Sequence, residues 1–255
     1  MQNSFVTDAI NLKSYNLSEA DKIIVMYSKE KGLIRGVAKG VKKPKSKLGA
    51  RMDLLVANTL MLHKGRNLDT ICQAEVVNNF YKTRQDIDKI CYSTYVTEVV
   101  HNFGIEEDPC SEIIYDLLYQ TLNTISTAET KVDIMLAVIK FQLKMMIESG
   151  FSIELSQCLC CHNHLQNETM YFVPQLGGIV CADCAGHVHY NKKQIPYKLR
   201  DFFKQMAITP FDVKCEYETK ANEKVCMVSF EALKEYITLK SPKKFKSTNI
   251  LQEVG

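Results

Sequence analysis

Residues 22–40 read KIIVMYSKEKGLIRGVAKG and hold two β-rich segments joined by a short polar turn. Two similar segments follow at 57–65 and 69–77, and glycines mark the bends between them. An open sheet of so few short strands would leave exposed edges, whereas a closed barrel would not. We therefore expect a small barrel of the five-stranded OB-fold type over residues 1–80.

Beyond the barrel region, apolar residues recur with the period of an amphipathic α-helix. The pattern predicts helices over 84–103 and 110–125, and a third helix that begins at a capping box between Ser126 and Glu129. Gly150 is expected to end that third helix. One face of the first helix is expected to hold Ile87, Ile90, Cys91, Tyr95, Val99 and Phe103. These apolar stripes are buried only when the helices pack against one another, so we interpret them as helical core rather than as a cofactor site.

Four cysteines form the most specific motif of the chain. Cys158 and Cys161 make one CxxC turn and Cys181 and Cys184 make a second. Each turn aims two thiolates at one point, so two turns complete the tetrahedron of a zinc site. A hairpin bending at 174–178 would fold the second turn onto the first. We predict a single structural zinc, because four thiolates leave no position for water or substrate.

Other residues beside the two turns offer alternative zinc ligands. Cys160 leaves open a slipped first turn, and two HxH pairs flank the cysteines: His162, His164, His187 and His189. Spacing favours the four cysteines, and we interpret the histidines as exposed loop residues. Neither HxH pair is the HxE motif of a zinc deaminase. The sequence also lacks GxxxxGK[ST] and HExxH, so no catalytic residue is predicted.

These patterns together predict an α+β chain of several domains. Residues 1–80 form the nucleic-acid-binding OB-fold β-barrel, and 81–155 form the first part of a helical domain. The zinc-binding insertion occupies 156–190. Residues 191–255 complete the helical domain and end in a basic tail.

Composition places the chain among ordinary globular proteins. Its 255 residues are 46% hydrophobic and 24% charged, with a net charge of +3. A bulk charge this small cannot hold nucleic acid by itself. No apolar run is long enough to span a membrane, and the first residues lack the pattern of an export signal. Ten cysteines without such a signal fit a reduced, cytoplasmic location better than a disulfide framework.

Positive charge is concentrated in one segment, RGVAKGVKKPKSKLGAR at 35–51. The segment has no Asp or Glu, and its basic residues are Arg35, Lys39, Lys42, Lys43, Lys45, Lys47 and Arg51. Its glycines and proline suit a strand that continues into an extended loop. Such a loop on a small barrel can follow a sugar-phosphate backbone with little sequence preference. The alternative is a solvated loop that only keeps the protein soluble. Candidates for base stacking are Tyr27, Phe5, Tyr15 and Phe80.

Several stretches resemble a known family. Residues 21–55 and 63–77 are similar to the N-terminal domain of the RecO family of bacterial recombination and repair proteins. FKSTNIL at 245–251 resembles the closing KSR-like motif of that family. The resemblance implies an OB-fold, a helical domain with a zinc-binding insertion, and a role without catalysis. It further implies binding to single- and double-stranded DNA, annealing of complementary strands, and work with RecR in loading RecA onto DNA coated by single-strand binding protein (SSB).

The resemblance also assigns residues. The seven basic residues of 35–51 match the family's basic N-terminal surface, and Arg66 matches its GR turn. The four-cysteine version of the insertion is matched by Cys158, Cys161, Cys181 and Cys184. DNA and recombination proteins as partners imply a place in the cytoplasm, on the nucleoid.

Two further functions compete with a DNA-binding mediator. In a protein-interaction adaptor with a structural zinc site, the helical domain and the insertion dock partners, and DNA contact is secondary. A zinc-dependent enzyme acting on nucleic acids needs an open metal position. Partner binding that survives loss of the basic segment would favour the adaptor, and a metal-bound water would favour the enzyme.

Overall fold

The computed structural model describes residues 4–166 and 168–247. The chain forms two compact units. One comprises residues up to Thr127 together with Lys246 and Ser247, and the other comprises residues 128–245. Thr248 and Asn249, in the closing motif of the predicted basic tail, lie outside the described residues. The four-domain division with boundaries at 80, 155 and 190 stays a prediction.

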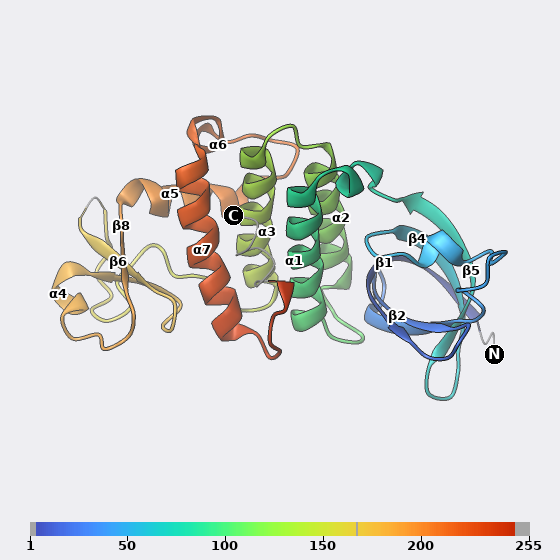
Figure 1. Ribbon diagram of the computed structural model, residues 1–255. Coiled ribbons are helices and arrows are strands. Elements are labelled where there is room, and N and C mark those ends of the chain that lie inside the picture. Colours follow the sequence, from blue (N-terminus) through green and yellow to red (C-terminus); the bar gives the residue numbers. More distant parts are fainter. Residues whose placement is uncertain (1–3, 167, 248–255) are drawn as a thin grey trace. The chain divides into compact units, whose positions relative to one another are not determined.

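Five strands form a closed barrel in the first unit (Figure 1). They are β1 (Ser4–Asn16), β2 (Lys22–Ser28), β3 (Gly32–Ala38), β4 (Ala57–His63) and β5 (Asp69–Asn78). The order around the barrel is β1-β2-β3-β5-β4. The short β3–β5 pair is parallel, and the other four pairs are antiparallel. This is the arrangement of an OB-fold, so the predicted fold class is confirmed.

Alternating apolar residues fill the barrel. Ile24 and Met26 of β2 belong to its core, as do Leu60 and Leu62 of β4, and all four are fully buried. The period of two along each strand sends the intervening side chains outward. Any binding surface of the barrel therefore lies on its outside.

Two helices complete the first unit, α1 (Ile87–Phe103) and α2 (Ser111–Thr127). Sequence periodicity predicted both helices, but the predicted buried face of α1 is wrong at its beginning. Ile87 and Ile90 are exposed, whereas later residues of the stripe such as Tyr95 are buried. The period identifies an apolar stripe, but it does not show where along the helix a neighbour covers that stripe.

α2 packs against the outside of β2 and β3, and α1 packs against β1. The outward residues of β2, Val25 and Tyr27, are only 1% and 0% exposed. Tyr27 donates a 2.8 Å hydrogen bond to Asp108 in the loop between the helices. Burial, together with this bond, raises the pKa of Tyr27. Gly32 approaches the same loop so closely that a Cβ there would lie 2.5 Å from the carbonyl oxygen of Ile105. The β2–β3 hairpin is thus packed tightly against the helices.

Three long helices form the body of the second unit: α3 (Lys131–Glu148), α5 (Tyr197–Ile208) and α7 (Glu223–Lys240). α3 packs against both of the others, and the short helix α6 (Glu216–Lys220) precedes α7. No helix within residues 4–166 and 168–247 is long and apolar enough to cross a lipid bilayer.

The beginning of α3 corrects the predicted capping box. Ser126 belongs to α2, and Glu129 lies in the loop that follows. The N-cap is Thr130, whose side-chain oxygen accepts a hydrogen bond from the backbone N–H of Asp133. Gly150 follows the end of α3 with a φ of 78°, as expected of a glycine that ends a helix.

A buried ion pair fastens the segment between α5 and α6. Lys140 of α3 lies 2.9 Å from Glu218, and both side chains are almost fully buried. Lys140 also donates hydrogen bonds to the backbone carbonyls of Pro210 and Val213. Because an unpaired buried charge is costly, removal of either partner would release this segment.

A three-stranded sheet lies between α3 and α5 in the chain. Its strands are β6 (Met170–Val173), β7 (Gly178–Cys181) and β8 (Lys193–Ile195), in the order β7-β6-β8. β6 and β7 form an antiparallel hairpin whose turn spans 174–177, which confirms the predicted bend. The short helix α4 (Ala182–Ala185) follows β7 directly.

Candidate metal centre and nucleic-acid interface

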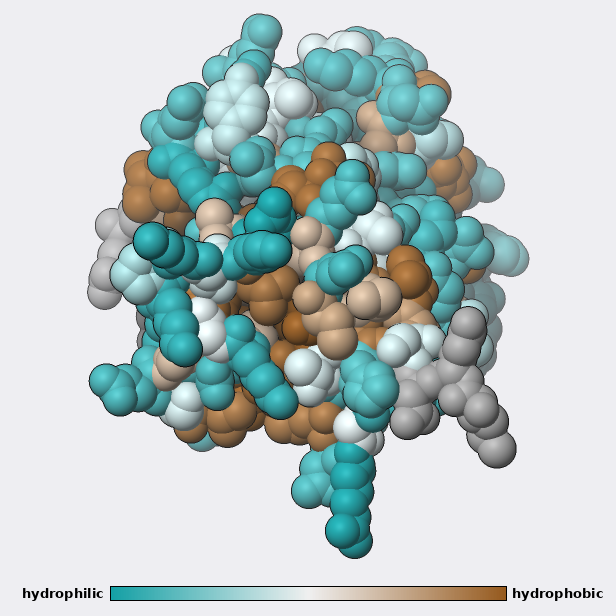
Figure 2. Space-filling view, turned by 90° about the vertical axis from the view of Figure 1, so that its right-hand side faces the viewer, coloured by the Kyte–Doolittle hydropathy of each residue, from teal (hydrophilic) through white to brown (hydrophobic). Residues whose placement is uncertain are grey.

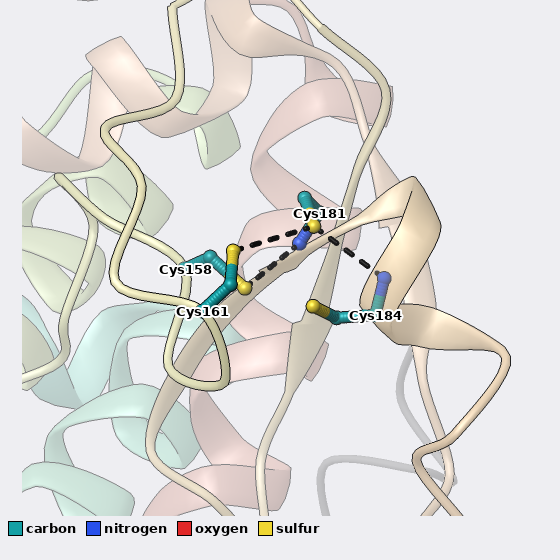
Figure 3. Close-up of side chains that lie close together, drawn as sticks. All are labelled: Cys158, Cys161, Cys181 and Cys184. Carbon is teal, nitrogen blue, oxygen red and sulfur yellow. Dashed lines mark hydrogen bonds between the residues drawn. The ribbon is translucent and has the colours of Figure 1, made fainter.

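Four thiols lie together in the 156–190 segment (Figure 3). The sulfur atoms of Cys158, Cys161, Cys181 and Cys184 are all within 4.8 Å of one another, and those of Cys161 and Cys181 are 3.9 Å apart. A tetrahedral zinc ion with Zn–S bonds of about 2.3 Å has S–S edges of about 3.8 Å. The donor set and its spacing therefore fit a metal ion held by four thiolates.

Local backbone structure brings the two CxxC turns together. The first turn closes where the N–H of His162 donates a 2.9 Å bond to the carbonyl of Cys158. The N–H of Leu159 donates a 2.9 Å bond to the carbonyl of Ile179 in β7. The second turn begins at the last residue of β7, Cys181, and continues into α4. The bond from Leu159 therefore holds the first turn beside the second.

The backbone of the turns favours a thiolate at Cys158. Burial by itself would raise the pKa of this thiol, but the N–H groups of Cys161, Cys181 and Cys160 lower the pKa to about 6. A hydrogen bond with Cys181 instead raises the pKa of Cys184. Neighbouring thiolates repel, so four thiols this close cannot all ionise without a cation among them.

Cys160 and the flanking histidines lie outside the cluster. Within the described residues, the group of ligand atoms close enough to share one metal ion consists of the four cysteines. The thiol of Cys160 is exposed. The histidines are exposed too, at positions His162, His164, His187 and His189. The geometry therefore favours the four-cysteine set over a slipped turn or a histidine ligand.

The basic side chains of the 35–51 segment are all exposed, as is Arg66 in the β4–β5 loop. Arg35 on β3 lies 3.7 Å from Glu106, and Lys42 donates a 2.9 Å hydrogen bond to the carbonyl of Ser18. Within the described part of the chain, no ion pair involves Lys39, Lys43, Lys45, Lys47, Arg51 or Arg66. Most of the positive charge of this segment is thus available to a ligand.

Two buried asparagines that were not among the predicted site residues hold the 3₁₀ helix η1 (Gly49–Met52). The amide nitrogens of Asn11 and Asn58 each donate a 2.9 Å bond to the backbone carbonyl of Arg51, and Asn11 donates another to Asp53. Both asparagines are fully buried, and Asn11 lies at a β-bulge of β1. An asparagine among mostly apolar residues of a strand segment, as in AINL at 9–12 and VANTLML at 56–62, is the signal that could have identified them.

The aromatic candidates for base stacking divide into two pairs. Tyr27 and Phe80 are buried in the protein core, which excludes them from base stacking. Tyr15 is exposed and Phe5 is half-buried. Because Phe5 packs against the barrel core, Tyr15 is the one of the four candidates whose ring is open to a nucleotide.

Asp21 fixes the first turn of the basic loop. Its Oδ1 accepts a 2.7 Å bond from the N–H of Gly40, and this bond, aided by Ser18 and the charges of Lys39 and Lys43, lowers the pKa of Asp21. A lowered folded-state pKa means that the turn is stabilised above the ordinary pKa of 3.8 and loses this stabilisation as the pH falls through the lower folded value.

We therefore expect the Gly40 amide to lose protection from hydrogen exchange as the pH falls below about 4. Its protection factor, measured by NMR, reports the change. Asp21→Ala should remove the pH dependence and leave Gly40 poorly protected at neutral pH. A protection factor that is the same in both proteins would show that this bond does not hold the turn.

Fold and site together define a class of protein: a multidomain OB-fold protein with an exposed basic loop on the barrel and a four-cysteine cluster in a separate helical unit. The family model "Recombination protein O N terminal" matches residues 1–80, and the model "Recombination protein O C terminal" matches residues 84–249. The chain therefore belongs to the RecO family of DNA repair and recombination proteins.

Similar proteins cover most or nearly all of the chain. The DNA repair protein RecO of Desulforamulus reducens is 30% identical over 247 residues, which cover 97% of this chain and 93% of that protein. The RecO protein of Symbiobacterium thermophilum is 27% identical and covers 96% of this chain and 95% of its own length. That of Dehalococcoides mccartyi strain 195 is 33% identical and covers 71% of this chain and 70% of its own length.

Proposed function

We propose that this protein is a recombination mediator in DNA repair that binds single- and double-stranded DNA and anneals complementary strands. The observation that carries the proposal is the set of exposed, unpaired lysines on the OB barrel of a RecO-family chain. Contacts between these lysines and phosphates release condensed counterions, so binding needs no particular base sequence. When bound lysines screen the phosphate charges, complementary strands repel each other less and meet more readily. Base pairing then drives annealing without nucleotide hydrolysis. The proposed role is not enzymatic.

The proposed partners are RecR, SSB and, indirectly, RecA. With RecR the protein would help to load RecA onto SSB-coated single strands, in the cytoplasm on the nucleoid. A groove of 730 Å³ between α5, α6 and α7 supports a protein contact. Leu199 and Phe202 give it apolar lining, and Lys198 and Lys224 add positive charge, whereas Lys220 is paired with Glu216 in the same lining. Charge complementarity suits this groove to the acidic tail of SSB.

The four-cysteine cluster is proposed to hold one structural zinc ion. Its ligands would be Cys158, Cys161, Cys181 and Cys184, whose spacing fits a tetrahedron. Four thiolates complete the usual coordination of zinc and leave no position for a reacting water. The ion would brace the 156–190 segment and take no part in chemistry.

An annealing assay tests the proposed function. Complementary oligonucleotides that carry a fluorophore and a quencher are mixed with the protein, first bare and then coated with SSB. We expect annealing at least about tenfold faster than without protein, because shielded charges raise encounter rates. If the protein binds neither single strands nor duplexes at low salt, the proposal is wrong.

The 730 Å³ groove also favours a second function, a protein-interaction adaptor for which DNA contact is secondary. The adaptor would bind SSB or RecR with unchanged affinity after neutralisation of the basic loop. By itself it would anneal strands little faster than buffer. The two functions thus give opposite results in the same annealing assay.

A further inference from the structure

The β2–β3 face, which OB-folds usually present to nucleic acid, is closed in this protein. Val25 and Tyr27 point outward from β2 but are buried, because α2 packs on this strand and Tyr27 is bonded to Asp108 in the loop between α1 and α2. The basic residues on this side are paired with carboxylates near the helices: Lys29 with Asp116, Lys31 with Glu107 and Arg35 with Glu106. A 300 Å³ pocket beside the β4–β5 loop has Glu106 and Glu107 in its lining. A DNA strand therefore cannot lie on this face in the usual way.

The outside of β1, β4 and β5 is open instead. Val6, Met61 and Gln73 are register neighbours across these three strands, and Val6 is 63% exposed. Together with the segment around η1, they line a groove of 460 Å³. Figure 2 views the barrel side and shows apolar side chains gathered in the middle, with hydrophilic side chains around them.

This groove carries positive charge on the η1 segment. Lys47 and Arg51 line it together with one acidic residue, Glu75, and neither cation forms an ion pair with any described residue. One guanidinium nitrogen of Arg51 donates to the carbonyl of Lys47, which leaves its other N–H groups available. The backbone of Arg51 is held by Asn11 and Asn58. The protein thus fixes a cation beside an apolar surface, the combination that a nucleotide requires.

We infer that this groove binds unpaired nucleotides of single-stranded DNA. Phosphates lie along Lys47 and Arg51, and base faces rest against Val6 and Met61. The inference depends on the proposed DNA-binding function. It adds where on the barrel DNA binds and that the bound DNA is single-stranded. Bases in a duplex are stacked on their neighbours, so only a single strand can offer their faces to an apolar surface. The groove therefore prefers single strands, while the exposed lysines of 39–45 serve both forms.

Replacement of Val6 by Glu tests the groove. This side chain is exposed, so the change adds negative charge to the groove without disturbing the core. We expect the affinity for oligothymidylate of about 12 nucleotides to fall at least about tenfold, because one base contact is lost. The affinity for a duplex of equal length should change little. Fluorescence anisotropy at fixed salt measures both. The matched control is Val77→Glu, on β5 outside the groove and 51% exposed, which should bind both forms normally.

A footprint on the unaltered protein gives an independent test. Cys72 is an exposed thiol in the groove, and Cys160 is an exposed thiol in the other unit. Oligothymidylate should slow alkylation of Cys72 but not of Cys160, and duplex should protect Cys72 less, as quantified by mass spectrometry.

The outcomes separate this inference from the proposed function. Equal losses for single strand and duplex in Val6→Glu, or full alkylation of Cys72 in the presence of bound oligothymidylate, would overturn the groove while leaving DNA binding intact. If the protein binds neither oligothymidylate nor duplex, both the groove and the proposed DNA-binding function are wrong.

Discussion

Cys184→Ser is expected to abolish zinc binding and to unfold the 156–190 segment locally. A structural zinc contributes about 10 kcal/mol or more of binding free energy, whereas the other links between the two turns are short strands and the hydrogen bond from Leu159 to Ile179. Cys184 is the suitable ligand to change, because no described backbone N–H donates to its sulfur, whereas N–H groups donate to those of Cys158 and Cys181. Metal analysis should show one zinc per wild-type chain and a strongly reduced content in the variant.

Cys160→Ser is the matched control for this change. Cys160 lies beside the cluster but outside it, so its loss should leave the zinc content and the melting curve unchanged. Hydrogen exchange should localise the effect of Cys184→Ser to the insertion, and DNA affinity should persist because the barrel belongs to the other unit. Metal-free wild-type protein with an unaltered melting curve would rule out a structural zinc.

Short-range patterns predicted the parts of this molecule that depend on neighbouring residues. The CxxC turns and the bend at 174–178 follow from local spacing, and the structure brings the four cysteines together. The β-rich run KIIVMYS predicted the strand β2 for the same reason, because its composition and the turn signals around it span only a few residues.

Contacts between distant segments set the features that sequence reasoning missed. Tyr27 was a candidate for base stacking from sequence, but it is buried because α2 packs on β2 and Asp108, far along the chain, accepts its hydrogen bond. Asn11 and Asn58 acquire their role because a bulge and a strand pairing bring both to the carbonyl of Arg51. Composition alone identified the basic segment. Distant partners such as Glu106, which pairs with Arg35, decide which of its cations stay unpaired.

Neutralisation of three loop lysines should weaken DNA binding and flatten its dependence on salt. The lysines are Lys39, Lys43 and Lys45, which form no ion pair in the described residues and do not line the groove of Val6. Each phosphate contact contributes about 0.9 to the slope of log affinity against log salt. Replacement of all three by Gln should therefore make the slope for duplex DNA shallower by up to about 2.7 and lower the affinity by about tenfold or more at low salt. The loss should be alike for unrelated base sequences, because these contacts reach phosphates only.

The control variant removes the same charge from the second unit, at Lys198, Lys220 and Lys224. It lowers the net charge equally, so a fall in affinity caused by bulk charge alone would appear in both proteins. We expect the control to keep the wild-type slope and affinity for DNA. A slope that stays unchanged in the loop variant would show that Lys39, Lys43 and Lys45 face solvent in the complex. The duplex would then be held by other exposed cations such as Arg66, and the remaining salt dependence would give the number of phosphates that they contact.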